Sequence, residues 1–308
     1  MMMQASASAP GKVILLGEHF VVHGNPAIVS SIDLRARVYA SRKPDPRVVL
    51  EGGVEENPAI EAAKHVLKLA GARLGLSLRI ESQIPQSVGL GSSAAISVAS
   101  AAATMLLLGK GLDLEKVVEA AHVGEKLVHY TPSGIDTSIA ALGGAGIYDR
   151  RMGYRRAEIG LRRLLIVNTG RQRKTGDLVK IVREFREENP EEFSRLSDEA
   201  KLIVEEALDA LKSEDLERLG ELMNRNQRLL RRIGVSSPEI EEAISLCLSA
   251  GAYGAKLTGA GGGGCVIAVA DYDKLDGIAE SVSRRFQVFK ARLVVDGVRA
   301  EPPPEKPP

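Results

Sequence analysis

The chain has 308 residues, of which 44% are hydrophobic and 26% are charged, and its formal net charge is +1. This composition is typical of a folded globular protein, and the near-zero charge argues against a partner attracted by a strong overall field, such as nucleic acid or acidic lipid. The two cysteines, Cys247 and Cys265, form neither a disulfide framework nor a zinc spacing, which favours a reducing compartment.

No targeting or membrane segment is expected. The N-terminus, MMMQASASAPGK, lacks the charged start and the long apolar run of a signal peptide. The longest apolar run, residues 94–108, is short and rich in Ala and Ser, which indicates a buried helix rather than a membrane span. We therefore expect a cytoplasmic protein that binds neither membranes nor nucleic acid. Its oligomeric state stays open, with a homodimer as one possibility.

The first half mixes strands and helices. Segments rich in Val, Ile and Ala predict strands, and Asn57 followed by Pro58 is typical of a helix N-terminus. Asp113 is a second candidate N-cap. In chain order we expect strands at residues 12–19 and 26–42, a helix at 59–71, a strand at 76–84, an alanine-rich helix after a glycine loop, and a helix at 114–129.

The second half is mainly helical. Its start is set by a basic, irregular stretch at residues 150–160, where we expect the domain boundary. The expected elements are a strand from residue 161, helices within 176–233, a helix from Ser237-Pro238 to about Gly251, a strand after a glycine-rich loop, a helix at 273–286 and a strand at 289–297. Because strands and helices do not alternate strictly, the fold class is α+β. The predicted domains are 1–155 and 156–300, followed by a disordered tail at 301–308.

The loop PQSVGLGSSAA, residues 85–95, favours an anion. Small residues at a helix N-terminus free backbone N–H groups, and the helix dipole favours negative charge there. A dinucleotide fingerprint is disfavoured because four residues separate the preceding strand from Gly89. A Walker A loop is excluded because no Gly-Lys-Ser/Thr follows. The alternative is a glycine-rich helix entry packed for steric reasons.

Ser92 and Ser93 offer hydroxyls to a phosphate-bound Mg²⁺, which usually takes only one or two further protein ligands. A carboxylate is therefore sought elsewhere in the chain. Glu125 lies late on a predicted helix, and Asp136 follows a Pro-Ser-Gly turn that restricts its freedom. The alternatives are an exposed Glu125 paired with His129, and an Asp136 that only forms a turn.

Two further segments stand out. KLTGAGGGGC, residues 256–265, is so rich in glycine that its backbone must approach a neighbour closely or adopt positive φ, unless it is a flexible linker. Near the N-terminus, Lys12 follows Pro-Gly and precedes a buried-looking strand, so we expect it to point into a cleft. A zinc site at His19 and His23 is disfavoured because no third ligand is spaced nearby.

Together, PGKVILLGEH, GLGSSAA and KLTGAGGGGC resemble the three motifs of the GHMP kinase superfamily, in order and across nearly the whole chain. GEHFVVHG is similar to the form found in the mevalonate kinase family. The resemblance implies a ribosomal-protein-S5-like N-terminal half, a ferredoxin-like C-terminal half, and an active site in the cleft between them. It implies ATP and Mg²⁺, and transfer of a phosphoryl group to the primary hydroxyl of mevalonate, a small-molecule partner.

The resemblance also assigns roles by position. Asp136 and Lys12 are implied to be catalytic, and Ser93 and Glu125 to hold the metal. The implied ATP-binding residues are Gly89, Leu90, Gly91, Ser92, Ser93 and Ala94. The implied substrate-binding residues are Lys12, Glu18, His19, Asp136 and Thr175. The implied supporting loop is Gly259, Ala260, Gly261 and Gly262.

Two positions depart from the family pattern, because Ser87 and Tyr130 stand where glycine is usual. If residue 87 needs positive φ, Ser carries a steric cost that Gly would not. An aromatic ring at residue 130 either narrows the substrate pocket near Asp136 or turns outward, and the sequence does not decide between the two. Phosphomevalonate kinase, with a substrate phosphate held by Arg171, Arg173 and Lys174, is an alternative function. A binding protein that keeps the fold without catalysis is a second alternative.

Overall fold

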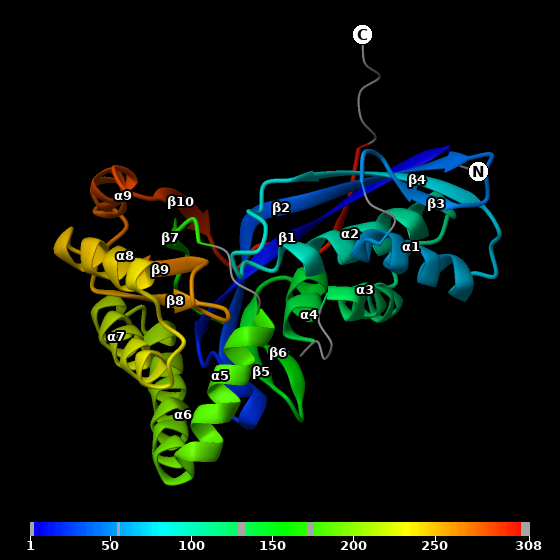
Figure 1. The fold of residues 1–308 in the computed structure, drawn as a ribbon. Coiled ribbons are helices and arrows are strands. Elements are labelled where there is room, and N and C mark those ends of the chain that lie inside the picture. Colours follow the sequence, from blue (N-terminus) through cyan, green and yellow to red (C-terminus); the bar gives the residue numbers. More distant parts are fainter. Residues whose placement is uncertain (1–2, 54–55, 129–133, 172–174, 303–308) are drawn as a thin grey trace.

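The computed structural model describes residues 3–53, 56–128, 134–171 and 175–302 (Figure 1). Within them, two β-sheets are each packed against helices, and the expected α+β class is confirmed. The first sheet and its helices come from the N-terminal half, apart from one strand, β11 (Arg299–Glu301), which comes from the C-terminal end of the chain. The second sheet and its helices come from the C-terminal half. No helix in this described part combines the length and the apolar character needed to cross a membrane.

Two long antiparallel strands form the centre of the N-terminal sheet. β1 begins earlier than predicted, at Gln4, and its pairing with β2 shifts register on both sides of Lys12. Such bulges redirect side chains and are frequent beside functional sites. The strand order is β11-β1-β2-β4-β3, with β5 and β6 continuing from β2. The strands are β1 (Gln4–Leu16), β2 (Ala27–Lys43), β3 (Val48–Leu50), β4 (Gly75–Ser82), β5 (Ala145–Asp149) and β6 (Gly153–Arg156).

The helices of this half lie on one face of the sheet (Figure 1). The alanine-rich helix α2 packs on β1 and β2 and is buried on nearly all sides, as its composition predicts. Asn57 caps α1 by accepting a hydrogen bond from the Ala59 N–H, which confirms the predicted start. The helices are α1 (Pro58–Leu69), α2 (Ser92–Leu107), α3 (Leu114–Val128) and α4 (Ile135–Leu142). α4 was not among the helices expected from the sequence, which indicated only a Pro-Ser-Gly turn before Asp136.

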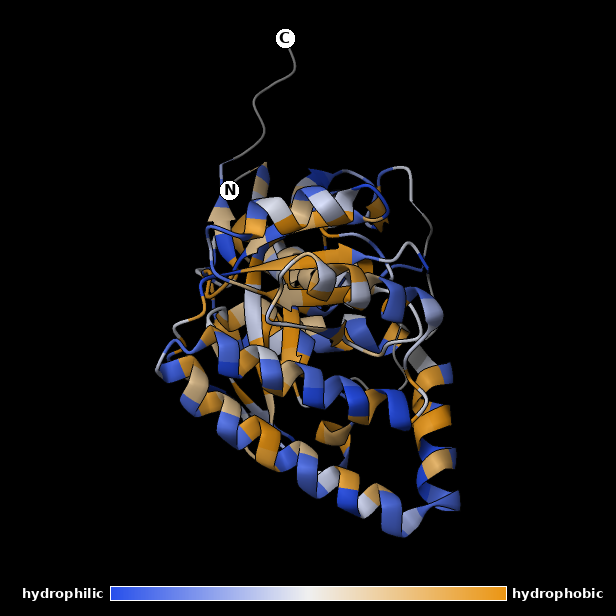
Figure 2. Cartoon of the chain, turned by 90° about the vertical axis from the view of Figure 1, so that its left-hand side faces the viewer, coloured by the Kyte–Doolittle hydropathy of each residue, from blue (hydrophilic) through white to orange (hydrophobic). Residues whose placement is uncertain are grey.

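The C-terminal sheet has the order β10-β7-β9-β8. Its helices are amphipathic, with apolar residues on the buried side and polar residues on the outer side. In Figure 2 hydrophilic and hydrophobic residues therefore alternate along these helices. The predicted helical stretch 176–233 is divided near Pro190 and Asp215. The elements are β7 (Arg163–Asn168), α5 (Thr175–Glu188), α6 (Pro190–Lys212), α7 (Leu216–Arg232), α8 (Pro238–Ser249), β8 (Gly254–Thr258), β9 (Cys265–Val269), α9 (Leu275–Ser283) and β10 (Gln287–Arg292).

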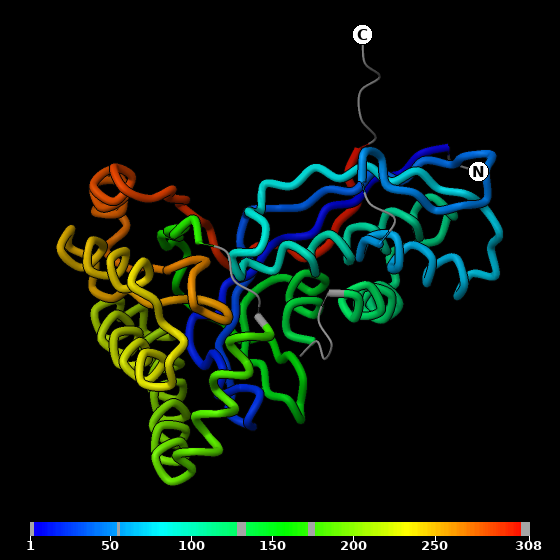
Figure 3. Tube along the Cα trace, in the orientation of Figure 1, coloured from blue at the N-terminus to red at the C-terminus, as the bar shows by residue number. Residues whose placement is uncertain are grey.

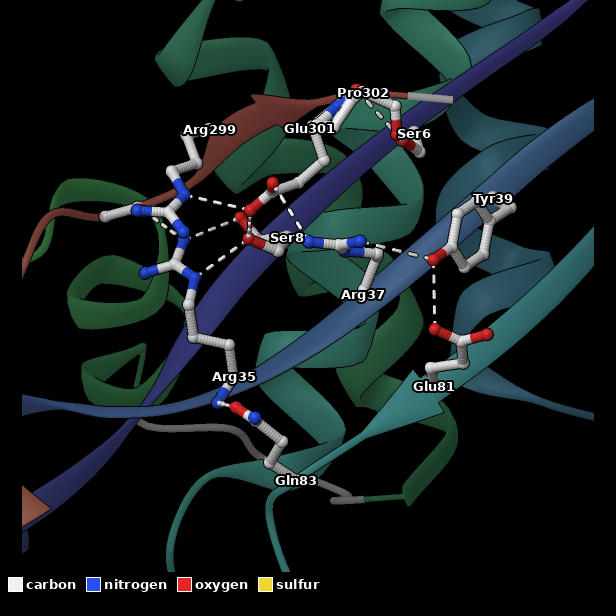
Figure 4. A network of polar contacts seen from close by, with 11 residues as sticks. Ser6, Ser8, Arg35, Arg37, Tyr39, Glu81, Gln83, Arg299, Glu301 and Pro302 are labelled. Atoms are coloured by element: carbon white, nitrogen blue, oxygen red, sulfur yellow. Dashed lines mark hydrogen bonds and ion pairs between the residues drawn. The ribbon is translucent and has the colours of Figure 1, made fainter. Parts of the chain in front are cut away.

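The chain then returns to its N-terminal half. β11 (Arg299–Glu301) pairs with β1, so the red and blue ends of the trace run side by side in Figure 3. Figure 4 shows the Glu301 carboxylate between Ser8, Arg37 and Arg299, while Ser6 donates to the Pro302 carbonyl.

The prediction of a disordered tail from residue 301 is therefore wrong for Glu301 and Pro302, because strand pairing and these polar contacts hold them. Residues 303–308 lie outside the described residues. The division of the chain into domains at residues 155 and 156, at the end of β6, stays a proposal.

Candidate active site

Lys12 and Asp136 meet although 124 positions of sequence separate them. The Lys12 Nζ lies 3.3 Å from Asp136 Oδ1 and donates a hydrogen bond of 3.0 Å to the carbonyl oxygen of Gly89. Lys12 is buried on β1, whereas Asp136, in the first turn of α4, keeps 34% of its side-chain surface exposed. The pair therefore joins a buried cation to a carboxylate that solvent or a substrate can still reach.

The glycine loop lies against the same part of β1. The backbone N–H of Lys12 donates to the Leu90 carbonyl at 2.9 Å, which fixes the loop beside the lysine. Gly91, at φ 74°, is the N-cap of α2, so Ser92, Ser93 and Ala94 form the first turn of that helix. The Ser92 hydroxyl oxygen is buried and has no hydrogen-bond partner among the described residues. A buried hydroxyl at a helix N-terminus suits a phosphate oxygen or a phosphate-bound cation.

Ser93 and Glu125 are also brought together, from α2 and α3. The Ser93 hydroxyl donates to Glu125 Oε1, and Glu125 is 3% exposed. Burial raises the pKa of the Glu125 carboxyl to about 7, the Ser93 hydrogen bond opposes this rise, and the nearby Asp136 charge adds to it. A bound cation would stabilise the ionised carboxylate. A serine oxygen and a carboxylate oxygen are hard ligands that fit Mg²⁺.

The loop between β8 and β9, residues 259–264, is the third glycine loop, and it packs directly on the glycine loop around Gly89. A Cβ atom added to Gly89 would lie 3.2 Å from the Thr258 carbonyl oxygen, and one added to Gly259 would lie 3.2 Å from the Gly89 Cα. Gly259, Gly261 and Gly262 all have positive φ. The loop connects the paired antiparallel strands β8 and β9, so it is a connection within the sheet's framework and not a flexible linker.

Glu18 and His19 follow the end of β1, close to the third loop. Glu18 forms an ion pair with Lys256 of β8, and both side chains are buried, at 1% and 0% exposure. The His19 ring nitrogen Nε2 lies 2.9 Å from the Ala260 carbonyl oxygen. Because a carbonyl only accepts hydrogen bonds, this nitrogen carries the proton. Burial lowers the pKa of His19 to about 4, so the ring is neutral near pH 7 and its Nδ1 is an acceptor.

Other predicted residues lie apart from these contacts or are not described. Thr175 begins α5, but its side chain lies outside what the structure describes, as do Tyr130, His129, Arg173 and Lys174. Arg171 forms an ion pair with Glu239 at 2.7 Å on the surface. Ser87 has φ 59°, so the position does require the positive φ that Gly adopts more easily.

Sequence reasoning missed two polar residues beside the site. In the sequence, Lys256 marks only the start of a glycine-rich segment, and Asn226 is only part of the helices expected within residues 176–233. Asn226 is fully buried on α7, and its side-chain oxygen accepts from the Gly17 N–H at 3.4 Å. The available signal was a lysine within an otherwise apolar strand and an amide on the buried face of a helix, both of which need partners when buried.

Comparison with known proteins agrees with this arrangement. The sequence matches the family profiles "GHMP kinases N terminal domain" over residues 57–144 and "GHMP kinases C terminal" over residues 207–288. It is 39% identical to mevalonate kinase of Aeropyrum pernix, an alignment that covers 96% of this chain and 98% of that protein. It is 40% identical to mevalonate kinase of Archaeoglobus fulgidus, covering 88% and 94% of the two chains.

The fold is similar to that of L. major mevalonate kinase, whose crystal structure was solved in complex with R-mevalonate. The TM-score is 0.86 and the sequence identity is 33%, with 96% of this chain and 97% of that chain covered. The match therefore extends through both sheets and includes the segments that carry the site. The chain belongs to the GHMP kinase family, in its mevalonate kinase branch.

Proposed function

We propose that this chain transfers the γ-phosphoryl group of ATP to the C5 hydroxyl of (R)-mevalonate, giving 5-phosphomevalonate and ADP, as a cytoplasmic step of isoprenoid synthesis. The observation that carries the proposal is the Lys12–Asp136 ion pair, which lies beside the Ser93–Glu125 contact at the start of α2. The relatives named mevalonate kinase align with 96% and 88% of this chain, which supports the same reaction here.

Binding of ATP is assigned to the loop 89–94. The first backbone N–H groups of α2 and the positive end of its dipole favour the phosphates, and the buried Ser92 hydroxyl gains a partner there. Ser93 and Glu125 would hold Mg²⁺, which neutralises charge on the phosphoryl oxygens when it is bound. These residues position the phosphoryl donor, which is the main task of a protein in phosphoryl transfer.

Asp136 is assigned as the general base. In the proposed step the C5 hydroxyl gives its proton to an Asp136 carboxylate oxygen, the hydroxyl oxygen bonds to the γ-phosphorus, and the bond between that phosphorus and ADP breaks. The Lys12 ammonium, 3.3 Å from the carboxylate, stabilises negative charge on the attacking oxygen. The hydrogen bond from Lys12 to the Gly89 carbonyl keeps the ammonium next to the loop 89–94, here called the phosphate loop.

Substrate choice tests the proposal. ADP release is measured with mevalonate, 5-phosphomevalonate, galactose and homoserine as acceptors. We expect kcat/KM for mevalonate to exceed every other value by at least about 100-fold, because a site built around one acceptor leaves its polar groups unpaired with another. A preference for 5-phosphomevalonate would identify a phosphomevalonate kinase. The absence of ADP release with all four acceptors would contradict the proposed catalysis.

The homodimer considered from the sequence stays a prediction. Size-exclusion chromatography with light scattering tests it directly, because a chain of 32.9 kDa doubles its mass on dimerisation.

A further inference from the structure

Two polar side chains of β8 reach the N-terminal half from the same strand face. Residues two apart in a strand project to the same side, which places Lys256 and Thr258 together. The Thr258 hydroxyl both donates to the Ile14 carbonyl at 3.0 Å and accepts from the Ile14 N–H at 2.9 Å. Lys256 pairs with Glu18, just beyond the end of β1. One strand of the second sheet thus holds both β1 and the turn that follows it.

The Glu18–Lys256 pair is closed to solvent. Besides Glu18, the Lys256 ammonium donates to the Leu257 carbonyl at 2.6 Å. The second carboxylate oxygen of Glu18, Oε2, is buried without a hydrogen-bond partner among the described residues. Because the Glu18 side chain is only 1% exposed and is engaged by a buried lysine, the pair fixes the backbone around it.

The turn that the pair holds is conformationally unfavourable. Gly17 has φ 98°, and His19, which is not a glycine, has φ 62°. A positive φ at a residue with a Cβ persists only where surrounding contacts fix it. Three contacts do so here, because Asn226 accepts from the Gly17 N–H, Lys256 holds Glu18, and Ala260 of the third glycine loop accepts from His19.

We propose that Lys256 is a positioning residue for substrate binding: through Glu18 it holds His19 in its strained conformation against the third glycine loop. The assignment rests on the proposed function, since it takes His19 as a contact of mevalonate. It also changes the role of Glu18, from a substrate ligand to the link between Lys256 and His19.

The test uses a double variant that removes both charges. Glu18→Leu/Lys256→Met replaces a buried ion pair by apolar groups of similar size, a change that proteins often tolerate without loss of stability. The single variants Glu18→Gln and Lys256→Met are made beside it, with thermal unfolding to confirm the fold. The control is Asp33→Ala/Arg292→Ala, which removes an exposed ion pair of 2.9 Å between β2 and β10.

We expect the folded double variant to show a KM for mevalonate at least tenfold higher. The KM for ATP should change less than twofold, because the phosphate loop at residues 89–94 has its own contacts with Lys12 and continues into α2. The control should stay within twofold of the wild type in both constants. A purely structural role would lower the unfolding temperature and would either leave both KM values unchanged or raise them by the same factor. Either of those results overturns the assignment.

Failure of the assignment and failure of the proposed function give different results. A wild-type chain that does not turn over mevalonate overturns the function and this assignment with it. A wild type that turns over mevalonate, beside a folded double variant with an unchanged KM for mevalonate, overturns this assignment alone. If the double variant does not fold, the same comparison of KM values is made on Glu18→Gln, which keeps the size of the side chain and removes its charge.

Discussion

His19 combines a positive φ with a nearly complete loss of solvent, and both features depend on residues far away in sequence. Its ring contacts Ala260, and its neighbour Glu18 contacts Lys256, across 241 and 238 positions of sequence. The motif around Glu18 and His19 predicted that they lie near the site. It did not predict the partner of Glu18, because a buried lysine carries no local signal of which carboxylate it meets.

Burial of His19 predicts a loss of stability in acid. The unfolded chain binds a proton at His19 near pH 6.5, whereas the folded chain does so only near pH 4, because burial lowers the pKa of the ring. Between these values the unfolded state binds more protons, so the free energy of unfolding falls as the pH falls. The expected loss from this residue is about 3 kcal/mol between pH 7 and pH 4.

Urea unfolding of the wild type and of His19→Asn at pH 7, 5.5 and 4 measures this loss. Asn tolerates positive φ and does not titrate in this range, so it separates the charge from the backbone. The wild type should lose more stability than the variant over the interval. Parallel pH profiles for the two proteins would contradict the assignment of the loss to His19.

In the third glycine loop, glycine is required for two separate reasons, which are the positive φ of its backbone and the close packing of that backbone on its neighbours. A Cβ atom added to Gly261 would lie 2.2 Å from the Val235 carbonyl oxygen, and this residue has φ 76°. Gly251 also has positive φ, at 103°, but open space surrounds it. The two residues therefore separate the cost of backbone conformation from the cost of a backbone contact.

Gly251→Ala should destabilise the protein by roughly 1–2 kcal/mol, the cost of a left-handed conformation for a residue with a Cβ. Gly261→Ala should cost about 1–3 kcal/mol more, because the packed backbone must move. Chemical denaturation of both variants gives the two free energies. Equal losses would show that the contact with Val235 does not restrict the loop.

The elements differ in how far sequence predicts them. α1 and α8 are capped by Asn57 and Ser237, whose side chains each accept a hydrogen bond from a helical N–H, and such caps can be recognised in a sequence. α4 has eight residues and a glycine N-cap, so neither its periodicity nor its start gives a clear signal. Its position nevertheless decides the site, because it carries Asp136.

At the scale of the whole molecule, contacts between distant segments hold the two halves together. Thr258 bonds to Ile14, Arg292 pairs with Asp33, and β11 adds a strand to β1 after the chain has completed the second sheet. The motifs predicted that Lys12, Ser93, Glu125 and Asp136 share one site. The return of the C-terminus was not predicted, because strand pairing across about 290 residues leaves no pattern in the local sequence.

The central claim is that Asp136, held beside Lys12, accepts the proton of the attacking hydroxyl. Its most direct test is kcat of Asp136→Asn with saturating mevalonate and ATP, beside Asp113→Asn, which changes an exposed helix cap on α3. We predict a folded Asp136→Asn protein whose kcat is at least ~100-fold below the wild-type value, as expected when a general base is removed. The Asp113 variant should keep its activity. A folded Asp136→Asn protein with near-normal kcat would contradict the account.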